Sequence, residues 1–272
     1  MPTRQQPVRW LSISVVIAAF TTPLYAGQTP AVDAPTAQLE PKALDVLKAM
    51  SARLTSTQGL SFKAVTTYEK PSRLGPALAY STVALVNEQR PDRLRVLTSG
   101  DGPATEFYYD GKQAYAYERK DNLLAQVDAP PTIDATLEAA YKRAAIYFPF
   151  TDVIVADPYK DLSRDMRVAF YVGQSTVVGD TTTDVIAYTS DTVFVQAWIG
   201  TEDKLPRRLR AEFLDDPSRS RHQVDFSDWK LSSAMPATFF KPDQIESAHR
   251  IKFAPPPSLR APQGVKEPVT KP

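Results

Sequence analysis

Hydrophobic residues recur at every second position after Gly59, and this period of two continues through most of the remaining chain. Leu94 and Val96, for example, alternate with Arg93 and Arg95. Such alternation is typical of strands that bury one face and expose the other. The pattern gives about six segments before residue 131 and about five after residue 167, joined by short turns. Because strands joined by short turns pair antiparallel, the sequence predicts an antiparallel meander rather than alternating β-α units.

One amphipathic helix is predicted before the strands. Leu44, Leu47, Met50 and Leu54 lie along one stripe at helical spacing in the segment PKALDVLKAMSARLTS. Pro41 opens this segment, and the first helical position tolerates proline because its amide hydrogen has no partner inside the helix. We therefore expect the domain to begin with a helix at residue 41.

A second helical region interrupts the alternation. Residues 131–150 carry apolar residues at three- and four-residue steps, namely Ile133, Leu137, Tyr141, Ala144 and Phe148. Residues 152–166 add a short second helix that is broken near Pro158. Thr132 or Asp134 is suited to cap the first of these helices. Helices placed in the middle of a sheet need an apolar surface for their stripe, and the sheet is the nearest one.

The segment ATEFYYDGKQAYAYE is a predicted β-hairpin, because Asp110-Gly111 is a strong two-residue turn signal between two alternating segments. An ordinary core would account for the aromatic residues around it. A sheet of this length, however, has more concave surface than about three helices cover, which favours an apolar cavity. We expect four aromatic residues of this hairpin to share one face: Phe107, Tyr109, Tyr115 and Tyr117.

The alternation slips by one residue in the last long segment, HQVDFSDWKL. Val224 and Phe226 share one parity, whereas Trp229 and Leu231 have the opposite one. A slip of one residue moves every later side chain to the other face of a strand. We interpret the slip after Phe226 as a bulge or a strand end. We then expect four residues to pack a closing loop on the rim or outer face of the sheet: Trp229, Leu231, Phe239 and Phe240.

The N-terminus has the pattern of a secretory signal peptide. Arg4 and Arg9 precede an apolar run of about eleven residues, and the segment TTPLYA ends in Ala26. The run is shorter than the roughly twenty residues that span a bilayer, so a retained anchor is the less favoured alternative. We expect a periplasmic protein with a signal peptide over residues 1–26, a flexible linker over 27–40, a domain over 41–253 and a proline-rich disordered tail over 254–272.

Residues that carry catalytic or metal chemistry are sparse. The chain has no cysteine and two histidines, His222 and His249, which nothing in the sequence pairs. It contains no G-x-S-x-G elbow, P-loop or G-x-G-x-x-G motif. Asp215-Asp216 precede Pro217, as aspartates in turns do. The sequence therefore predicts no enzyme, no catalytic residue, no metal and no cofactor, and a net charge of +1 gives no reason to expect nucleic acid as a partner.

Four local motifs, taken together, resemble those of the LolA/LolB-like superfamily of periplasmic lipoprotein carriers. They are RPDRLRV from Arg90, YYDGKQAYAYE from Tyr108, VQAWIGTEDKLPRRLR from Val195 and FSDWKLSSAMPATFF from Phe226. The order of helix, strands, helical insertion and further strands is also similar, and the resemblance spans about residues 41–243. The chain resembles a periplasmic branch of this superfamily more than the carriers proper, because it has a long proline-rich tail and no clear final strand.

The resemblance implies an α+β fold, an unclosed antiparallel half β-barrel of about eleven strands with an N-terminal helix and a helical lid inserted in mid-sheet. It also implies a hydrophobic ligand between barrel and lid. Arg90 matches the arginine that ties lid to barrel in the family, and a plain strand-edge charge is the alternative. The expected cavity residues are Phe62, Leu94, Val96, Phe107, Tyr109, Tyr115, Tyr117, Phe170, Val172 and Phe226. The expected lid residues are Ile133, Leu137, Tyr141 and Phe148.

The sequence leaves two functions open. The first is a periplasmic binding or carrier protein that buries an acyl chain, a lipid or a lipoprotein without covalent chemistry. The alternative is a regulatory or sensor module of the same fold that acts by protein-protein interaction, with a membrane-associated protein as partner. We expect a monomer that binds a hydrophobic small molecule or a lipoprotein acyl chain.

Overall fold

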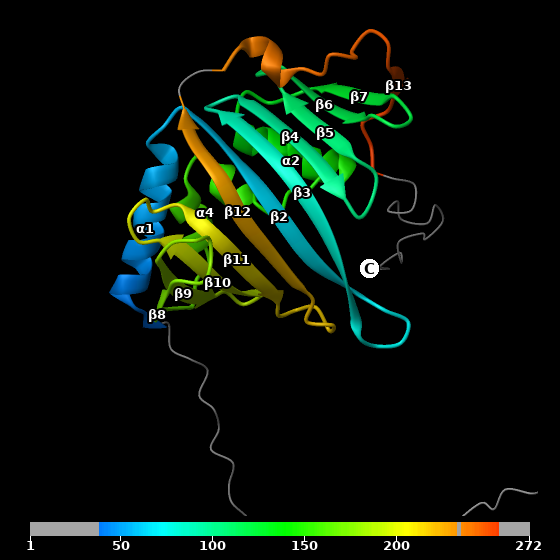
Figure 1. The fold of residues 1–272 in the computed structure, drawn as a ribbon. Helices are drawn as coiled ribbons and strands as arrows, with labels where there is room; N and C mark the ends of the chain where they lie inside the picture. Colours follow the sequence, from blue (N-terminus) through cyan, green and yellow to red (C-terminus); the bar gives the residue numbers. More distant parts are fainter. Residues whose placement is uncertain (1–37, 233–234, 256–272) are drawn as a thin grey trace, which may run out of the picture. The chain divides into compact units, whose positions relative to one another are not determined.

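The structure is a computed structural model that describes residues 38–232 and 235–255 (Figure 1). The expected signal peptide over residues 1–26, the linker up to residue 37 and the tail from residue 256 lie outside the described residues. Within the described residues, no helix is both long enough and apolar enough to cross a membrane.

Among the described residues, thirteen strands form one sheet. In chain order the strands are β1 (Gln38–Leu39), β2 (Gly59–Pro71), β3 (Ala77–Gln89), β4 (Arg93–Gly100), β5 (Thr105–Tyr109), β6 (Gln113–Glu118), β7 (Leu123–Asp128), β8 (Val168–Ser175), β9 (Thr183–Thr189), β10 (Val193–Gly200), β11 (Pro206–Phe213), β12 (Arg221–Ser232) and β13 (His249–Ile251). The helices are α1 (Pro41–Thr55), α2 (Ile133–Ala144), α3 (Thr151–Ile154), α4 (Pro158–Ser163) and the 3-10 helix η1 (Ala237–Phe240).

The sheet is open, with β1 and β13 at its two edges. The strand order is β1-β8-β9-β10-β11-β12-β2-β3-β4-β5-β6-β7-β13, so β12 and β2 pair although they are far apart in the sequence. Neighbouring strands are antiparallel except for the pairs β1 with β8 and β13 with β7. This arrangement confirms the expected α+β fold, with an unclosed and mostly antiparallel sheet, an N-terminal helix and helices inserted between β7 and β8.

The two edge strands have no counterpart in the sequence pattern. Strands β2 to β12 correspond to the alternating segments, whereas β1 and β13 are two and three residues long. Segments this short show no period. In β13, His249 pairs with Leu123 of β7, so the chain returns to the sheet after η1 and the expected lack of a final strand is wrong.

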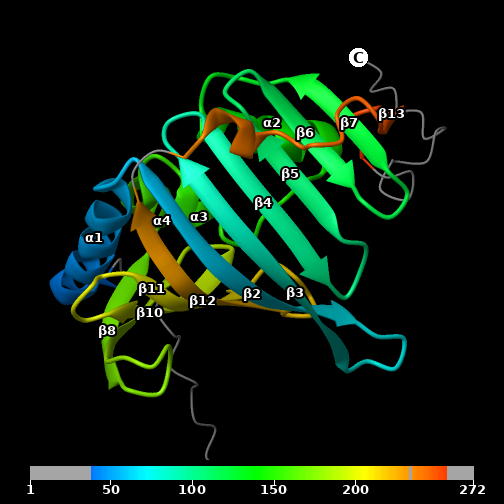
Figure 2. The same ribbon diagram turned by 45° about the horizontal axis from the view of Figure 1, so that its top comes forward.

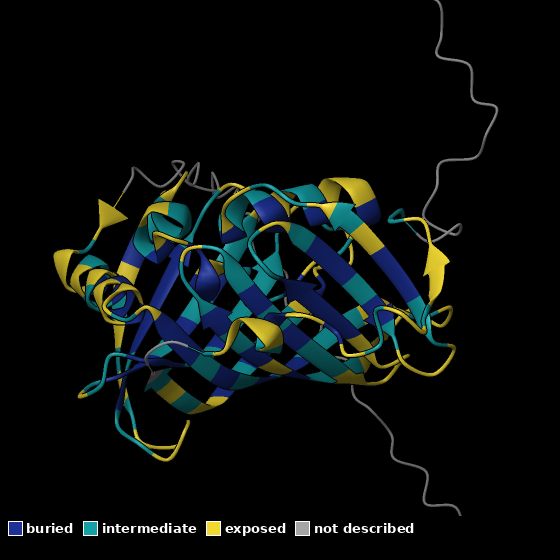
Figure 3. Ribbon diagram, turned by 90° about the horizontal axis from the view of Figure 1, so that it is seen from above, coloured by how far each residue is buried: buried dark blue, intermediate teal, exposed yellow. Residues whose placement is uncertain are grey.

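Helices α1 to α4 lie on one face of the sheet, which curves around them (Figures 2 and 3). Leu47, Met50 and Leu54 of α1 are fully buried, as the predicted stripe requires. They belong to the same core cluster as Phe62 of β2 and Phe226 of β12. We call this helix-covered face the concave face.

Helix α2 begins where the sequence predicts but turns a different side to the sheet. Thr132 caps it, since its hydroxyl accepts a hydrogen bond from a backbone amide at 3.3 Å. Ile133 and Leu137 are buried in the core. Tyr141 is 60% exposed, and the expectation that it packs on the sheet is wrong. A step of three from Leu137 reaches Ala140, which takes the buried position instead.

The hairpin of β5 and β6 divides its aromatic residues between the two faces of the sheet. Tyr108 pairs with Tyr115, and residues paired in this way point to the same side. The paired positions have opposite parity because an even number of residues separates them. Phe107 and Tyr109 therefore face the main core, whereas Tyr115 and Tyr117 pack in a second cluster with Tyr108. The expectation that all four share one face is wrong.

Strand β12 contains the slip as a β-bulge. Its register against β2 shifts after Ser227, so that β12 has one extra residue. Beyond the bulge Leu231 pairs with Leu60, a buried residue on the concave face. Phe226, Trp229 and Leu231 therefore all pack in or against the main core. The bulge corrects the parity, and the expectation that Trp229 and Leu231 lie on the rim or outer face is wrong.

The 3-10 helix η1 packs on the other face, as expected. The guanidinium of Arg95 lies 4.2 Å from the ring centroid of Phe239. Arg95 alternates along β4 with Leu94 and Val96, which face the main core, so its side chain points to the opposite side. Phe240 is fully buried beside it.

Strand β8 turns Ala169 and Tyr171 toward the core. Phe170 and Val172 are 42% and 52% exposed, and the expectation that they line a cavity is wrong. The segment VAFYV is apolar at both parities, so the sequence alone does not select a face. Helix α1 selects it, because the amine of Lys42 lies 3.3 Å from the ring centroid of Tyr171.

Candidate functional site

The middle of the concave face is filled by aromatic rings. The centroid of the Phe62 ring lies 5.6 Å from that of Phe150, 5.7 Å from that of Phe226 and 4.5 Å from that of Trp229. Edge-on and tilted packing at these distances is favourable for aromatic rings. The space in which a cavity was expected is therefore closed by packing at its centre, and the open volume lies to either side.

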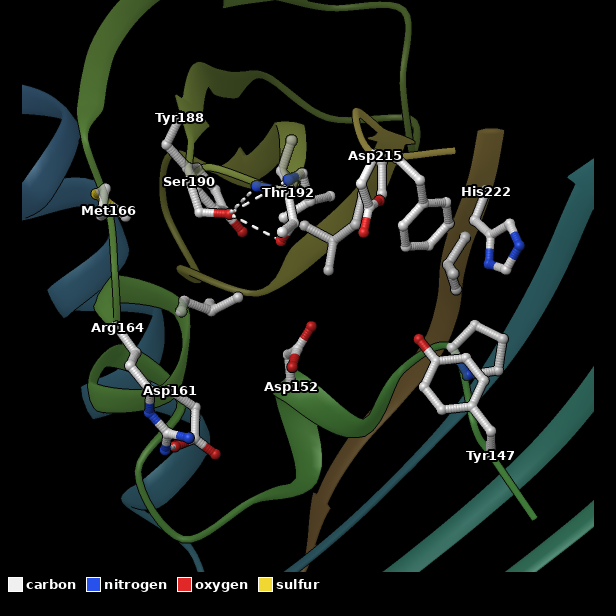
Figure 4. A pocket seen from close by; sticks show the side chains of 18 residues that line it. Tyr147, Asp152, Asp161, Arg164, Met166, Tyr188, Ser190, Thr192, Asp215 and His222 are labelled. Carbon is white, nitrogen blue, oxygen red and sulfur yellow. Dashed lines mark hydrogen bonds and ion pairs between the residues drawn. The ribbon is translucent and has the colours of Figure 1, made fainter. Parts of the chain in front are cut away.

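The first open volume is a cavity of about 370 Å³ between strands β9 to β12 and helices α3 and α4 (Figure 4). We call it the inner cavity. The apolar part of its lining includes Leu162, Met166, Val193, Val195, Leu209 and Val224. The polar part includes Asp152, Tyr188, Ser190, Thr192, Asp215 and His222. A volume of this size is typical of ligand pockets.

A groove of about 990 Å³ runs outside the inner cavity, between α2 and the segment of α3 and α4. We call it the outer groove. Leu137 and Tyr141 of α2 line it, and the ring of Tyr141 lies 6.5 Å from that of Tyr147. The outer groove shares four lining residues with the inner cavity, so the two are adjacent: Tyr147, Asp161, Arg164 and Phe213.

A third volume of about 310 Å³, the side pocket, lies at the other end of the concave face. We call the helical insertion from α2 to α4 the lid segment. Val96, Phe107 and Tyr117 line the side pocket together with Phe148 of the lid segment and Phe253 near the end of the described chain. Several of the expected cavity residues line none of the three volumes: Phe62, Leu94, Tyr109, Tyr115, Phe170, Val172 and Phe226. Most of the predicted cavity residues thus do not line the open space.

Asp152 projects from α3 into the middle of the inner cavity (Figure 4). The residue is exposed to the water that fills the cavity. Partial desolvation by the surrounding protein raises the pKa of Asp152, and the negative charge of Asp161 raises it further. Asp161 itself pairs with Arg164, whose Nη2 lies 2.6 Å from its Oδ1.

Tyr188 of β9 faces the same cavity. Its side chain is 5% exposed, and its hydroxyl has no hydrogen-bond partner among the described residues. Burial strongly raises the pKa of Tyr188, and Asp152 raises it further, which places the two side chains within electrostatic reach of each other. The phenol of Tyr188 is therefore neutral at physiological pH. Tyr147 also lines the cavity and is 55% exposed.

Arg90 joins the sheet to the lid segment. Its Nη1 donates a hydrogen bond of 2.9 Å to the carbonyl of Val155, which follows α3. Its Nε lies 3.0 Å from Oε1 of Glu88, a carboxylate with no exposed surface. Burial raises the pKa of Glu88 to about 8, although the charge of Arg90 opposes this shift. Arg90 is thus positioned to hold the lid segment against β3.

The histidines lie apart from each other in the structure. The ring of His222 is 4.9 Å from that of Phe213 and 6.0 Å from that of Tyr68, and burial lowers its pKa. His249 lies on the edge strand β13. In residues 38–232 and 235–255, no three His, Asp or Glu side chains gather as a metal site requires.

The sequence analysis did not single out Asp152, Tyr188 or Tyr147. A usable signal exists for Asp152, which is the one charged residue in the otherwise apolar and neutral segment 144–156. A lone carboxylate within an apolar segment is a candidate for a buried functional group. Tyr188 carries no such signal, because an alternating tyrosine in a strand is most often an ordinary core residue.

A family model described as "Predicted periplasmic protein (DUF2092)" matches residues 43–254. Among curated proteins, none matches the chain. Solved structures are similar at low identity. MucB is 15% identical over 75% of this chain and 63% of its own, with a TM-score of 0.39. A LolA superfamily protein from Nitrosomonas europaea is 12% identical over 75% of this chain and 99% of its own, with a TM-score of 0.35.

A third similar structure is a putative outer membrane lipoprotein-sorting protein domain from Vibrio parahaemolyticus. It is 10% identical over 73% of this chain and 96% of its own, with a TM-score of 0.35. The chain thus spans less than two thirds of the length of MucB and nearly the whole length of the other two.

Proposed function

Because the chain belongs to the DUF2092 family of predicted periplasmic proteins, we propose that it is a periplasmic binding or carrier protein for a hydrophobic ligand. The ligand class is an acyl chain, a lipid or a lipoprotein. It is held between the concave face of the sheet and the lid segment of α2 to α4, by burial and without covalent chemistry. The signal peptide over residues 1–26 directs the protein to the periplasm.

The observation that carries this proposal is the inner cavity and its continuation into the outer groove. The cavity lies under a lid segment whose helices α3 and α4 have four and six residues. About half of its lining residues are apolar, and each methylene that such a wall removes from water contributes about 0.8 kcal/mol. An alkyl chain that enters through the outer groove would pass Tyr147 and Phe213, which line both volumes.

Three sets of hydrogen bonds join the segment of α3 and α4 to the rest of the fold, beside the apolar packing of Phe150, Val153 and Ile154 in the core. Arg90 bonds the carbonyl of Val155, and the hydroxyl of Ser51 on α1 accepts a hydrogen bond of 3.0 Å from the amide of Tyr159. Asp134 accepts from the amide of Ala156. Breaking a few such contacts would admit a ligand without unfolding the sheet.

Native mass spectrometry and lipid extraction of protein purified from the periplasm test this function. We expect bound lipid in the wild type and about tenfold weaker binding of a fluorescent alkyl probe in Leu209→Trp, which fills the inner cavity. Leu85→Trp is the matched control, because Leu85 is exposed. Protein that is empty on isolation and binds no alkyl probe would overturn the proposal. N-terminal sequencing of the same sample tests cleavage before Gly27.

A second candidate, a module that binds a protein partner, is favoured by the outer groove. Tyr141 and Tyr147 are more than half exposed at this groove, and exposed tyrosines are common at protein interfaces. Photocrosslinking from position 141, with position 85 on the other face as control, tests this candidate. A protein adduct specific to position 141 would support it, and only lipid adducts at that position would contradict it.

A further inference from the structure

Asp152 lacks a counter-charge in the inner cavity. No hydrogen bond or ion pair joins its carboxylate to another residue of the described chain. Arg164, the arginine in the cavity lining, is already paired with Asp161. Asp215 also lines the cavity, and His222 is neutral because burial lowers its pKa. The lining therefore has an excess of negative charge.

Tyr188 is an independent observation that indicates a missing ligand group. Its hydroxyl is buried, unpartnered and directed at the same space as Asp152 (Figure 4). The other hydroxyls nearby are satisfied, because Ser190 Oγ accepts hydrogen bonds from the amides of Thr192 and Val193. Buried polar groups are nearly always hydrogen-bonded in native proteins. The buried hydroxyl of Tyr188 therefore indicates a missing partner, and the exposed carboxylate of Asp152 is free to bind the same ligand group.

The charge of the cavity lining indicates the chemistry of that ligand group. An anionic head group would meet Asp152 and Asp215 and be repelled. A metal ion would find too few ligands, since no group of three metal-binding side chains occurs in the described residues. A neutral head group would displace water from the carboxylate of Asp152 without compensating its charge. A protonated amine offers both a positive charge and several N–H donors, which suits a carboxylate and a phenol oxygen together.

We propose that the inner cavity binds a cationic amphiphile, whose ammonium group donates hydrogen bonds to the carboxylate of Asp152 and the hydroxyl oxygen of Tyr188. The alkyl chain lies against Leu162, Val195 and Leu209 and leaves through the outer groove. This inference rests on the proposed function, because it specifies the head group of the ligand held in the same cavity.

The first test compares three probes of equal chain length by isothermal titration calorimetry at pH 7, below the concentrations at which they aggregate. The probes are dodecylammonium, dodecanol and dodecanoate. A charge-assisted hydrogen bond corresponds to about tenfold to a hundredfold in affinity, so we expect dodecylammonium to bind at least tenfold more tightly than the other two. Equal binding of all three would overturn this inference and leave the proposed function standing. Binding of none would overturn both.

The second test uses variants. Asp152→Asn keeps the shape of the side chain and removes its charge, and we expect at least tenfold weaker binding of dodecylammonium with dodecanol affinity changed less than about twofold. Tyr188→Phe removes one hydrogen-bond acceptor, and we expect dodecylammonium to bind about threefold to tenfold more weakly to this variant. Asp121→Asn removes the same charge from an exposed turn and should change nothing. Unchanged dodecylammonium affinity in Asp152→Asn, or an equal loss for dodecanol, would overturn the assignment of Asp152.

Discussion

Glu88 and Asp152 are both carboxylates whose pKa the protein raises, and they differ in exposure and in what lies beside them. Glu88 on β3 has no exposed surface and has the guanidinium of Arg90 at 3.0 Å, and Arg90 also bonds the carbonyl of Val155. Asp152 on α3 is exposed to an open cavity and has an uncharged phenol, Tyr188, within electrostatic reach. At the junction of sheet and lid the chain itself supplies a positive charge beside the carboxylate, whereas in the cavity it does not.

This difference separates a structural carboxylate from a candidate binding group. Removing a carboxylate from water is unfavourable by several kcal/mol unless a partner offsets it. Glu88 is fully buried, has Arg90 beside it and has a pKa of about 8. Asp152 faces the cavity, where the fold supplies no positive partner, and α3 is held by its buried residues Val153 and Ile154. The comparison predicts that changes at the junction affect stability first, while changes in the cavity affect ligand binding first.

The largest effect on the free energy of unfolding is expected for Arg90→Leu. It removes the hydrogen bond to the carbonyl of Val155 and the guanidinium beside the buried Glu88. Leaving such buried polar groups without a partner lowers the free energy of unfolding by about 3 kcal/mol. Urea denaturation followed by tryptophan fluorescence measures it. Arg73→Leu, at an exposed turn, should stay within about 0.5 kcal/mol of the wild type. A junction that is not structural would show the same small change for both variants.

The next largest effect is a pH dependence of the free energy of unfolding, which Glu88 produces. Its pKa is about 8 in the folded protein and 4.5 ordinarily, so between these values the folded state holds a proton that the unfolded state has lost. The contribution of Glu88 therefore favours folding at low pH and is lost as pH rises through about 8, by up to about 1.4 kcal/mol per pH unit.

Glu88→Gln removes this titration. We expect the free energy of unfolding to fall less steeply between pH 5 and pH 8 in the variant than in the wild type, as urea denaturation at several pH values measures. Asp152 contributes a slope of the same sign in both proteins, so the difference between them isolates Glu88. Parallel curves for the two proteins would show that Glu88 does not keep its proton in the folded state.

A smaller effect distinguishes two buried tyrosines. The hydroxyl of Tyr109 donates a hydrogen bond of 2.5 Å to the carbonyl of Pro130 before α2, whereas that of Tyr188 has no partner. Tyr109→Phe should lower the free energy of unfolding by about 1 kcal/mol, because it removes the shorter of the two hydrogen bonds to that carbonyl and leaves the one from Thr136. Tyr188→Phe should leave stability unchanged or slightly higher. An equal loss in both would mean that Tyr188 is already bonded in the ligand-free protein.

The sheet could be predicted from the sequence because period two is a local signal. The strands β2 to β12 and the stripe Leu47, Met50 and Leu54 are read from spacing alone. Which side chains of a strand face the core depends on more distant parts of the chain. The prediction failed at Tyr115, because the length of the β5–β6 turn decides which positions of β6 face the core. It also failed at Trp229, because one extra residue in β12 reverses the alternation.

The cavity was predicted in kind but not in place. The sequence shows that more apolar sheet exists than the helices cover, yet it does not show that Phe150 of the lid segment fills the centre next to Phe62. Which part of a concave face stays open depends on where short helices such as α3 and α4 pack. Those helices are too short for their position to be read from a helical period. Asp152 and Tyr188 come together for the same non-local reason.

The smallest stability effect, and the one that most sharpens the comparison, is expected for Asp152→Asn in the ligand-free protein. Loss of the carboxylate removes its repulsion from Asp161, so the variant should be slightly more stable, by about 0.5 kcal/mol or roughly 1–2 °C in the midpoint of thermal unfolding. Asp161→Asn is the matched contrast, since Asp161 is paired with Arg164 and its loss should not stabilise. Differential scanning calorimetry at pH 7 measures both. A destabilised Asp152→Asn would mean that the chain itself supplies a partner for Asp152, and the contrast with Glu88 would then disappear.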